Sequence, residues 1–165
     1  MAGDINVKVN LKELEDLTKA FPEASLRARR SRITEALLLL EGAVKDLTPE
    51  GAGPTHLRDT IFQKVEMFGE SVWGMVGTPA IYGAAIEYGT KPHYPPVAPI
   101  LFWVEKILGL SGKEAKSVAF LIARKISKKG TYGTHMFQYG FERNKSKVIG
   151  ILKQIPEDIV KAVTA

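Results

Sequence analysis

Apolar and polar positions change their spacing along the chain, and the spacing predicts helices and strands in turn. Leucines recur at helical spacing within residues 11–20. A second helix is expected from Pro22, a residue that suits the first turn of a helix, to about Leu47. The apolar positions expected on its buried side are Leu26, Ile33, Leu37, Leu40 and Val44.

Alternating side chains predict strands before and after these two helices. Ile5, Val7 and Val9 indicate a strand at the edge of a sheet. Residues 60–67 and 71–77 also alternate, and a turn at residues 68–70 would join them into a β-hairpin. Residues 48–54, rich in glycine and proline, are expected to form the loop before it.

Residues 81–96, IYGAAIEYGTKPHYPP, are the stretch around which the chain is expected to be organised. A short helical turn that contains the acid Glu87 should stop at Gly89, because glycine commonly follows the last helical residue. Three prolines then fix the backbone and remove amide donors, so this part is expected to be extended, outside any helix or central strand. A stiff segment with exposed aromatic side chains suits contact with another surface.

The remainder of the chain is expected to be helical. A helix over residues 99–108 is apolar around much of its girth and should be largely covered. Ser111 and Glu114 have the spacing of a capping box that opens a further helix, closed by Lys128, Lys129 and Gly130. After a joint at residues 131–134, a last helical region should break near Pro156.

These elements predict an α+β fold. A small antiparallel sheet with a central β-hairpin packs on the long N-terminal helix, and C-terminal helices are added to it. At 165 residues the chain is expected to be a single domain. It comprises an N-terminal helix and hairpin (residues 1–80), the proline-rich central stretch (81–98) and a C-terminal helical part (99–165).

Composition narrows the classes of function. The chain is 45% hydrophobic, carries a net charge of +5 and contains no cysteine, which excludes disulfides, thiolate metal sites and cysteine nucleophiles. Its N-terminus does not have the apolar segment of a signal peptide, and its longest apolar run is too short to span a bilayer. No membrane partner is therefore expected.

Catalytic and metal-binding patterns are weak in this sequence. His56, His93 and His135 lie in three separate loop or joint regions without a partner at helical spacing, so no metal site and no catalytic role are predicted. Glu87 would need a second positioned group to act as a general acid. Because glycine-rich phosphate loops are also missing, neither an enzyme nor a cofactor is expected.

Basic residues gather on two predicted helices, at Arg124, Lys125, Lys128 and Lys129 and at a group of arginines further upstream. A solvated face is the simplest interpretation of both groups, and contact with DNA phosphates or an acidic partner is the alternative. The residues that would make such contacts are Arg27, Arg29, Arg30, Arg32, Lys128 and Lys129.

Four segments also have the residues of known motifs, in the same order. TPEGAGPTHLRDTI begins at Thr48 and YGAAIEYGT at Tyr82, while KPHYPPVAPILFWVEKILGL begins at Lys91 and KGTYGTHMFQYGFE at Lys129. They resemble the TP…TG.LR.S, YA..VE.GT, PH.PP…L..WV..KLG and GT.G..FF..A motifs of the tail-completion and minor tail (head–tail joining, neck) proteins of long-tailed bacteriophages. Met136-Phe137 stands where that family has an aromatic pair.

The resemblance implies a structural protein of the virion neck or upper tail, made in the host cytoplasm and built into an oligomeric ring. Its implied partners are further copies of itself and other head–tail connector, tail terminator or tail-tube proteins, with no cofactor. Residues expected at the interface are Tyr82, Glu87, Tyr88, His93, Tyr94 and Pro95. The alternative function is a nucleic-acid-binding accessory protein that uses the basic helix patches.

Overall fold

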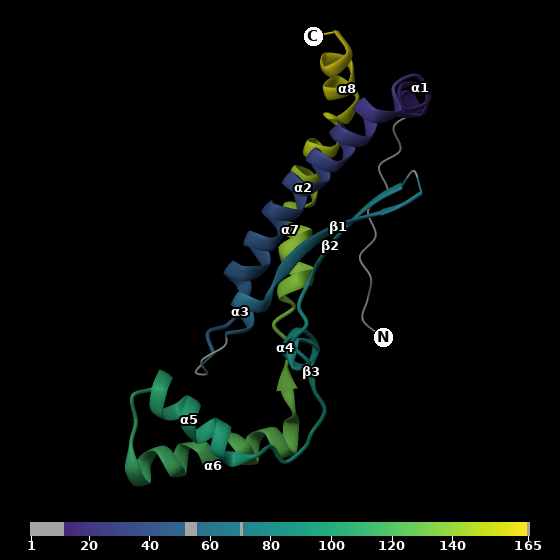
Figure 1. Cartoon of the computed structure of the whole chain (residues 1–165). Coiled ribbons are helices and arrows are strands. Elements are labelled where there is room, and N and C mark those ends of the chain that lie inside the picture. The colour runs from purple at the N-terminus through teal and green to yellow at the C-terminus, as the bar shows by residue number, and fades with distance from the viewer. Residues whose placement is uncertain (1–11, 52–55, 70, 165) are drawn as a thin grey trace. The chain divides into compact units, whose positions relative to one another are not determined.

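The helix that starts at Pro22 is the longest described helix, α2, and it ends at Leu47 as its apolar spacing predicts. The computed structural model (Figure 1) describes residues 12–51, 56–69 and 71–164. The predicted strand at Ile5, Val7 and Val9 lies outside these residues. Part of the predicted loop at residues 48–54, and Glu70 of the predicted turn, lie outside them as well.

The described elements confirm the mixed helix-and-sheet class, with an antiparallel hairpin, a long N-terminal helix and C-terminal helices. The helices are α1 (Lys12–Ala20), α2 (Pro22–Leu47), α3 (Leu57–Thr60), α4 (Gly83–Tyr88), α5 (Val97–Ile107), α6 (Gly112–Lys129), α7 (Met136–Leu152) and α8 (Ile155–Thr164). The strands are β1 (Phe62–Phe68), β2 (Ser71–Gly77), β3 (Gly89–Thr90) and β4 (Thr131–Tyr132).

Contacts within the chain group it into two compact units. The first comprises Met1–Asp46, Ile61–Gly77 and Phe137–Ala165, and the second comprises Leu47–Thr60 and Thr78–Met136. The prediction of a single domain stays a prediction.

In the first unit, α2 runs antiparallel to α7 and α8. Near the end of α2, Val44 lies against Gly140 of α7, where a Cβ atom would come within 2.9 Å of the valine side chain. Near the start of α2, Ala28 forms a buried cluster with Ile155 and Ile159 of α8, and leucines of α1 cover this cluster. Small residues at both ends allow the helix axes to approach closely.

The predicted buried side of α2 is confirmed at two positions. Leu37 and Val44 are buried, while Leu26, Ile33 and Leu40 are half-buried. The helix also buries three small residues that the apolar pattern did not select, Ser25, Ala28 and Ala36.

The hairpin of β1 and β2 packs one face on α2. Its antiparallel register pairs Val65 with Gly74. A Cβ atom on Gly74 would lie 2.7 Å from Leu37 Cδ1 and 2.8 Å from Ile33 Cγ2, so the strand passes directly over the helix there. The opposite face is exposed and carries large apolar side chains, namely Phe62, Phe68, Trp73 and Met75.

In the second unit, α5 and α6 pack around Val104, Ala115 and Ala119. The prediction that α5 is largely covered is wrong, because Phe102 within it, Ile107 at its end and Leu108 just after it are exposed. The element that packs most extensively against α5 in the described chain is α6, and one helix can cover only one side of another.

The predicted start of α6 is confirmed, but its capping box is not formed. Ser111 is the N-cap residue, yet its side chain makes no cap hydrogen bond. Gly112 has a φ of 60°, so the chain enters the helix along a left-handed path that differs from the usual cap. The predicted end is confirmed, since Gly130 follows Lys129 as the C-cap.

The break near Pro156 is also confirmed. Helix α7 ends at Leu152, two turn residues follow, and α8 begins at Ile155. Proline in the first turn of α8 loses no helical hydrogen bond, because the amide groups of the first turn have no partner within the helix.

A side-chain ion pair ties α2 to α8 within the first unit. The Nη2 of Arg32 donates a hydrogen bond to Oδ1 of Asp158 at 2.9 Å, and its Nε donates to the other carboxylate oxygen. The two side chains are 22% and 25% exposed. These hydrogen bonds hold the pKa of Asp158 below its ordinary value of 3.8.

Asp158→Asn should lower the thermal stability at pH 7 and change its dependence on pH. Since the pKa of Asp158 is lowered in the folded state, the pair stabilises the fold fully above pH 3.8 and stops doing so as the pH falls through the lowered value. The difference in melting temperature between wild type and variant should therefore shrink in strong acid. Thermal melting across this pH range measures it.

Glu157→Gln is the matched control, because it removes the exposed pair between Glu157 and Lys161 one residue away on α8. Exposed pairs at this spacing contribute little, so its melting curve should follow that of the wild type. A melting difference for Asp158→Asn that is independent of pH would contradict the role assigned to the pair.

Candidate interaction surface

The central stretch folds largely as its sequence predicts. Residues 83–88 form α4, and Gly89 follows as its C-cap with a φ of 77°. β3 comes next, and the chain from Lys91 to Pro96 is neither helix nor strand. The predicted short helix and glycine stop are therefore confirmed, and so is the prediction that the proline run lies outside any helix or strand.

A second segment is hydrogen-bonded to this stretch, which the sequence did not indicate. β3 pairs antiparallel with β4, with Gly89 opposite Tyr132 and Thr90 opposite Thr131. The amide of Thr134 donates to the Ile86 carbonyl at 2.8 Å, and the amide of His135 donates to the Glu87 carbonyl at 3.0 Å. Residues 131–132 of the predicted joint at residues 131–134 thus form one strand of a two-stranded sheet.

Glycines make this approach of two backbones possible. A Cβ atom on Gly89 would overlap the Thr131 carbonyl oxygen, and one on Gly130 would overlap the carbonyl oxygen of Thr90. A Cβ atom on Gly133 would likewise meet the Glu87 carbonyl oxygen. Gly89 and Gly130 also have positive φ with ψ near 180°, a region that essentially only glycine adopts. Both segments are therefore held in one arrangement.

Several aromatic and aliphatic side chains of these two segments are exposed. Tyr132 is 87% exposed and Ile81 is 98% exposed, and Tyr82, Tyr88 and Tyr94 are exposed as well. An open groove of about 350 Å³ lies beside β3 and β4. Its lining comprises Pro49, Tyr82, Ala85, Ile86, Thr90, His93, Ile126, Thr131, Tyr132 and Thr134.

Two of the predicted interface residues are not on this surface. Glu87 is only 4% exposed, because α4 turns it inward, and Pro95 is buried where the chain leads into α5. Both predictions are corrected, because these buried side chains are not part of the exposed surface. The predicted Tyr82, Tyr88, His93 and Tyr94 are all exposed.

Tyr132 is the most exposed aromatic residue of this surface, and it is not among the residues predicted from the sequence. A signal was present in the two glycines that flank this residue, Gly130 and Gly133, since glycine in a strand often marks the close approach of another backbone.

The histidines are not brought together. His93 is exposed, and its Nδ1 lies 2.9 Å from the Lys91 carbonyl oxygen. His135 has a φ of 51° and belongs to the hydrogen-bonded segment beside β4, while His56 is exposed just before α3. Among the described residues, no group of three histidine or acidic side chains could hold a metal ion.

The basic residues predicted to contact phosphates differ in their exposure and in whether another residue holds their side chains. Arg32 is held by Asp158 and Glu35, so its prediction as a phosphate contact is corrected. Arg27 pairs with Glu23 one turn away, and the guanidinium of Arg29, which is half-buried, donates to the Ser25 carbonyl at 3.3 Å. Arg30, Lys128 and Lys129 are exposed.

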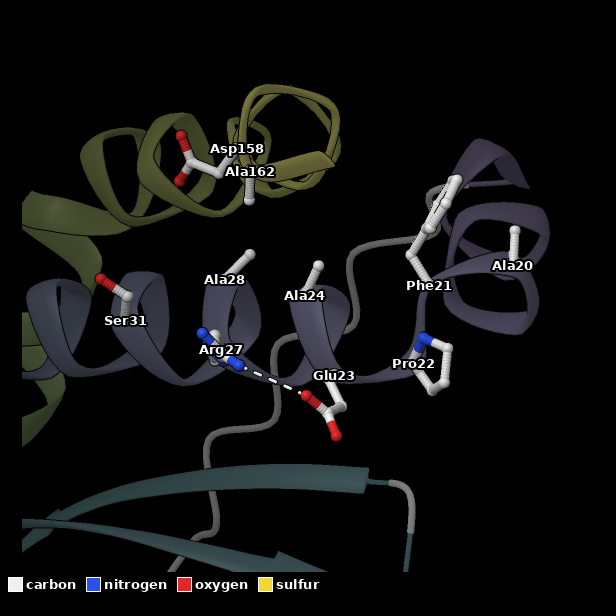
Figure 2. Close-up of a pocket in the computed structure, with 10 residues that line it drawn as sticks. All are labelled: Ala20, Phe21, Pro22, Glu23, Ala24, Arg27, Ala28, Ser31, Asp158 and Ala162. Carbon is white, nitrogen blue, oxygen red and sulfur yellow. Dashed lines mark hydrogen bonds and ion pairs between the residues drawn. The ribbon is translucent and has the colours of Figure 1, made fainter. Parts of the chain in front are cut away.

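Another groove, of about 590 Å³, lies between the start of α2 and α8 (Figure 2). Figure 2 shows Ala24 and Ala28 of α2 pointing toward Ala162 of α8, with the Arg27–Glu23 ion pair along one wall. Asp158, its other acid, is bonded to Arg32. The lining combines small apolar side chains with the polar side chains of Glu23, Arg27, Ser31 and Asp158, and both of these carboxylates are held in ion pairs.

Comparison with known proteins gives no relative. No protein-family model, no curated protein and no solved structure matches the chain. Within the described residues, no helix combines the length and the apolar composition needed to cross a bilayer.

Gly130→Ala should destabilise the protein by about 3 kcal/mol or more, because the new Cβ would be forced against the Thr90 carbonyl oxygen in a backbone conformation that alanine avoids. Gly42→Ala is the control. Gly42 lies within α2, where a Cβ would meet nothing within 4 Å, and the change should raise stability by roughly 0.5–1 kcal/mol. Urea unfolding of both variants measures this. Equal stabilities would mean that β3 and β4 do not meet as described.

Proposed function

We propose that this protein is a structural component of the neck or upper tail of a long-tailed bacteriophage, where it completes the tail and joins it to the head. In this proposal it acts through protein–protein contacts in a ring of identical copies, and it belongs to the virion after assembly in the host cytoplasm. The observation that carries the proposal is the set of exposed tyrosines on the central stretch and on β4.

The placement of these tyrosines suits an assembly surface. Aromatic anchors supply much of the binding energy at protein interfaces. Binding also costs less when the contact segment is already ordered, and here prolines and the hydrogen bonds between β3 and β4 restrict it before any partner arrives.

The resemblance in sequence adds support. Two segments are similar to the YA..VE.GT and GT.G motifs of the phage tail proteins, and their threonines Thr90 and Thr131 lie 41 residues apart along the chain. In this chain the two segments are paired as β3 and β4. Close packing of glycine backbones is a physical reason for both motifs to contain a glycine at the crossing.

Tyr94→Ala and Tyr132→Ala should each reduce the yield of joined heads and tails by roughly tenfold or more, because each removes an exposed aromatic anchor. Neither should change the free energy of unfolding by more than ~0.5 kcal/mol, since both side chains are exposed. Complementation of a phage or prophage that lacks the gene, with particles counted by electron microscopy, gives the yield. Thermal melting gives the stability.

Tyr139→Ala is the matched control, because Tyr139 is an exposed tyrosine on α7 outside the central stretch. It should assemble normally. Trp103→Ala is the stability control, since Trp103 is half-buried against the α5–α6 core, and its loss should cost about 2 kcal/mol. Normal assembly of the Tyr94 and Tyr132 variants would contradict the proposed function of this surface.

A further inference from the structure

Helix α6 carries an unusual share of the charge of the protein. Its 18 residues include six cations and one acid, a net charge of +5, which equals the net charge of the whole chain. The cations are Lys113, Lys116, Arg124, Lys125, Lys128 and Lys129, and all of them are exposed. Positive charge is thus concentrated on one helix.

The cations share the outward side of α6 with two apolar residues. Lys113, Arg124 and Lys128 follow one another at multiples of a helical turn, on the side opposite the buried Ala115 and Ala119. Phe120 and Leu121 lie in the middle of this stripe, and they are 51% and 60% exposed. An apolar centre with a charged rim is the usual composition of a protein-binding site.

We propose that the outward side of α6 binds an acidic segment of another protein. Apolar side chains of that segment contact Phe120 and Leu121, and its carboxylates pair with the surrounding cations, with Lys113 toward one end and Arg124 and Lys128 toward the other. The inference extends the proposed function, because it gives the chemistry of one partner. It is tested on purified protein, so its outcome does not depend on head–tail joining.

Three other kinds of binding partner fit the outward side of α6 less well than an acidic segment does. A membrane-surface helix buries its apolar face in lipid, but here that face packs on α5 around Val104. DNA phosphates would pair with the cations and leave Phe120 and Leu121 against a charged backbone. A second copy offers little complementary charge, because the most acidic described helices, α1, α4 and α8, each have a net charge of only −1.

The probe is a synthetic, fluorescein-labelled 18-residue helical peptide with two leucines ringed by six glutamates on one face. We expect saturable binding in fluorescence anisotropy that weakens as salt is raised. The same peptide with glutamine at the six glutamate positions should bind at least roughly tenfold more weakly. A 30-base-pair DNA duplex and vesicles containing one quarter phosphatidylserine are the competing probes.

Two double variants measure separately how the apolar centre and the charged rim contribute to binding of the peptide. The double variant Phe120→Ser/Leu121→Ser should bind the acidic peptide roughly tenfold more weakly and leave any DNA binding unchanged. The double variant Arg124→Glu/Lys128→Glu should weaken binding of the peptide by roughly tenfold or more. Its matched control is Lys145→Glu/Lys147→Glu on α7, which reverses two exposed charges elsewhere and should change affinity less than about twofold.

The inference is overturned if the acidic peptide does not bind, or if DNA or the vesicles bind more tightly than it does. It is also overturned if Phe120→Ser/Leu121→Ser binds the peptide like wild type, since the apolar centre would then play no part. All four proteins should melt alike, because every altered side chain is exposed.

Discussion

The approach of two glycine-containing backbones, at Gly89 and at Gly130, is the constraint on which the central stretch depends. Neither position accepts a Cβ, because each faces a carbonyl oxygen of the other segment. Once β3 and β4 are paired, α4 is fixed at its end and Tyr132 is brought beside the segment that leads into the proline run. The positions of the exposed tyrosines follow from this crossing.

The first unit is stabilised by a different kind of contact. There α2 makes close contacts through small residues, at Ala28 against α8 and at Gly140 of α7 against Val44. Gly74 lets the hairpin cross the same helix. In both units the tightest contacts use residues with little or no side chain, and the large apolar side chains of the hairpin and of the central stretch are exposed.

Local pattern was enough to predict the hairpin and the described helices other than the four-residue α3. Pro22 indicated the start of α2, helical spacing its extent to Leu47, and glycine the ends of α4 and α6, because these signals depend on neighbouring residues. The pairing of β3 with β4 joins residues far apart in sequence through two-residue strands, which are too short to show a period. The burial of Glu87 and Pro95, and the ion pair of Arg32, depend on the same kind of long-range contact.

Hydroxyl-radical footprinting tests most directly whether the central stretch is an assembly surface. The modification rates of Tyr94 and Tyr132 would be compared between the isolated protein and particles that contain it, with Tyr139 of α7 as the internal reference. All three side chains are exposed in the isolated chain. We expect Tyr94 and Tyr132 to become protected in the particle while Tyr139 keeps its rate. Unchanged rates for Tyr94 and Tyr132, with Tyr139 protected, would contradict the assignment.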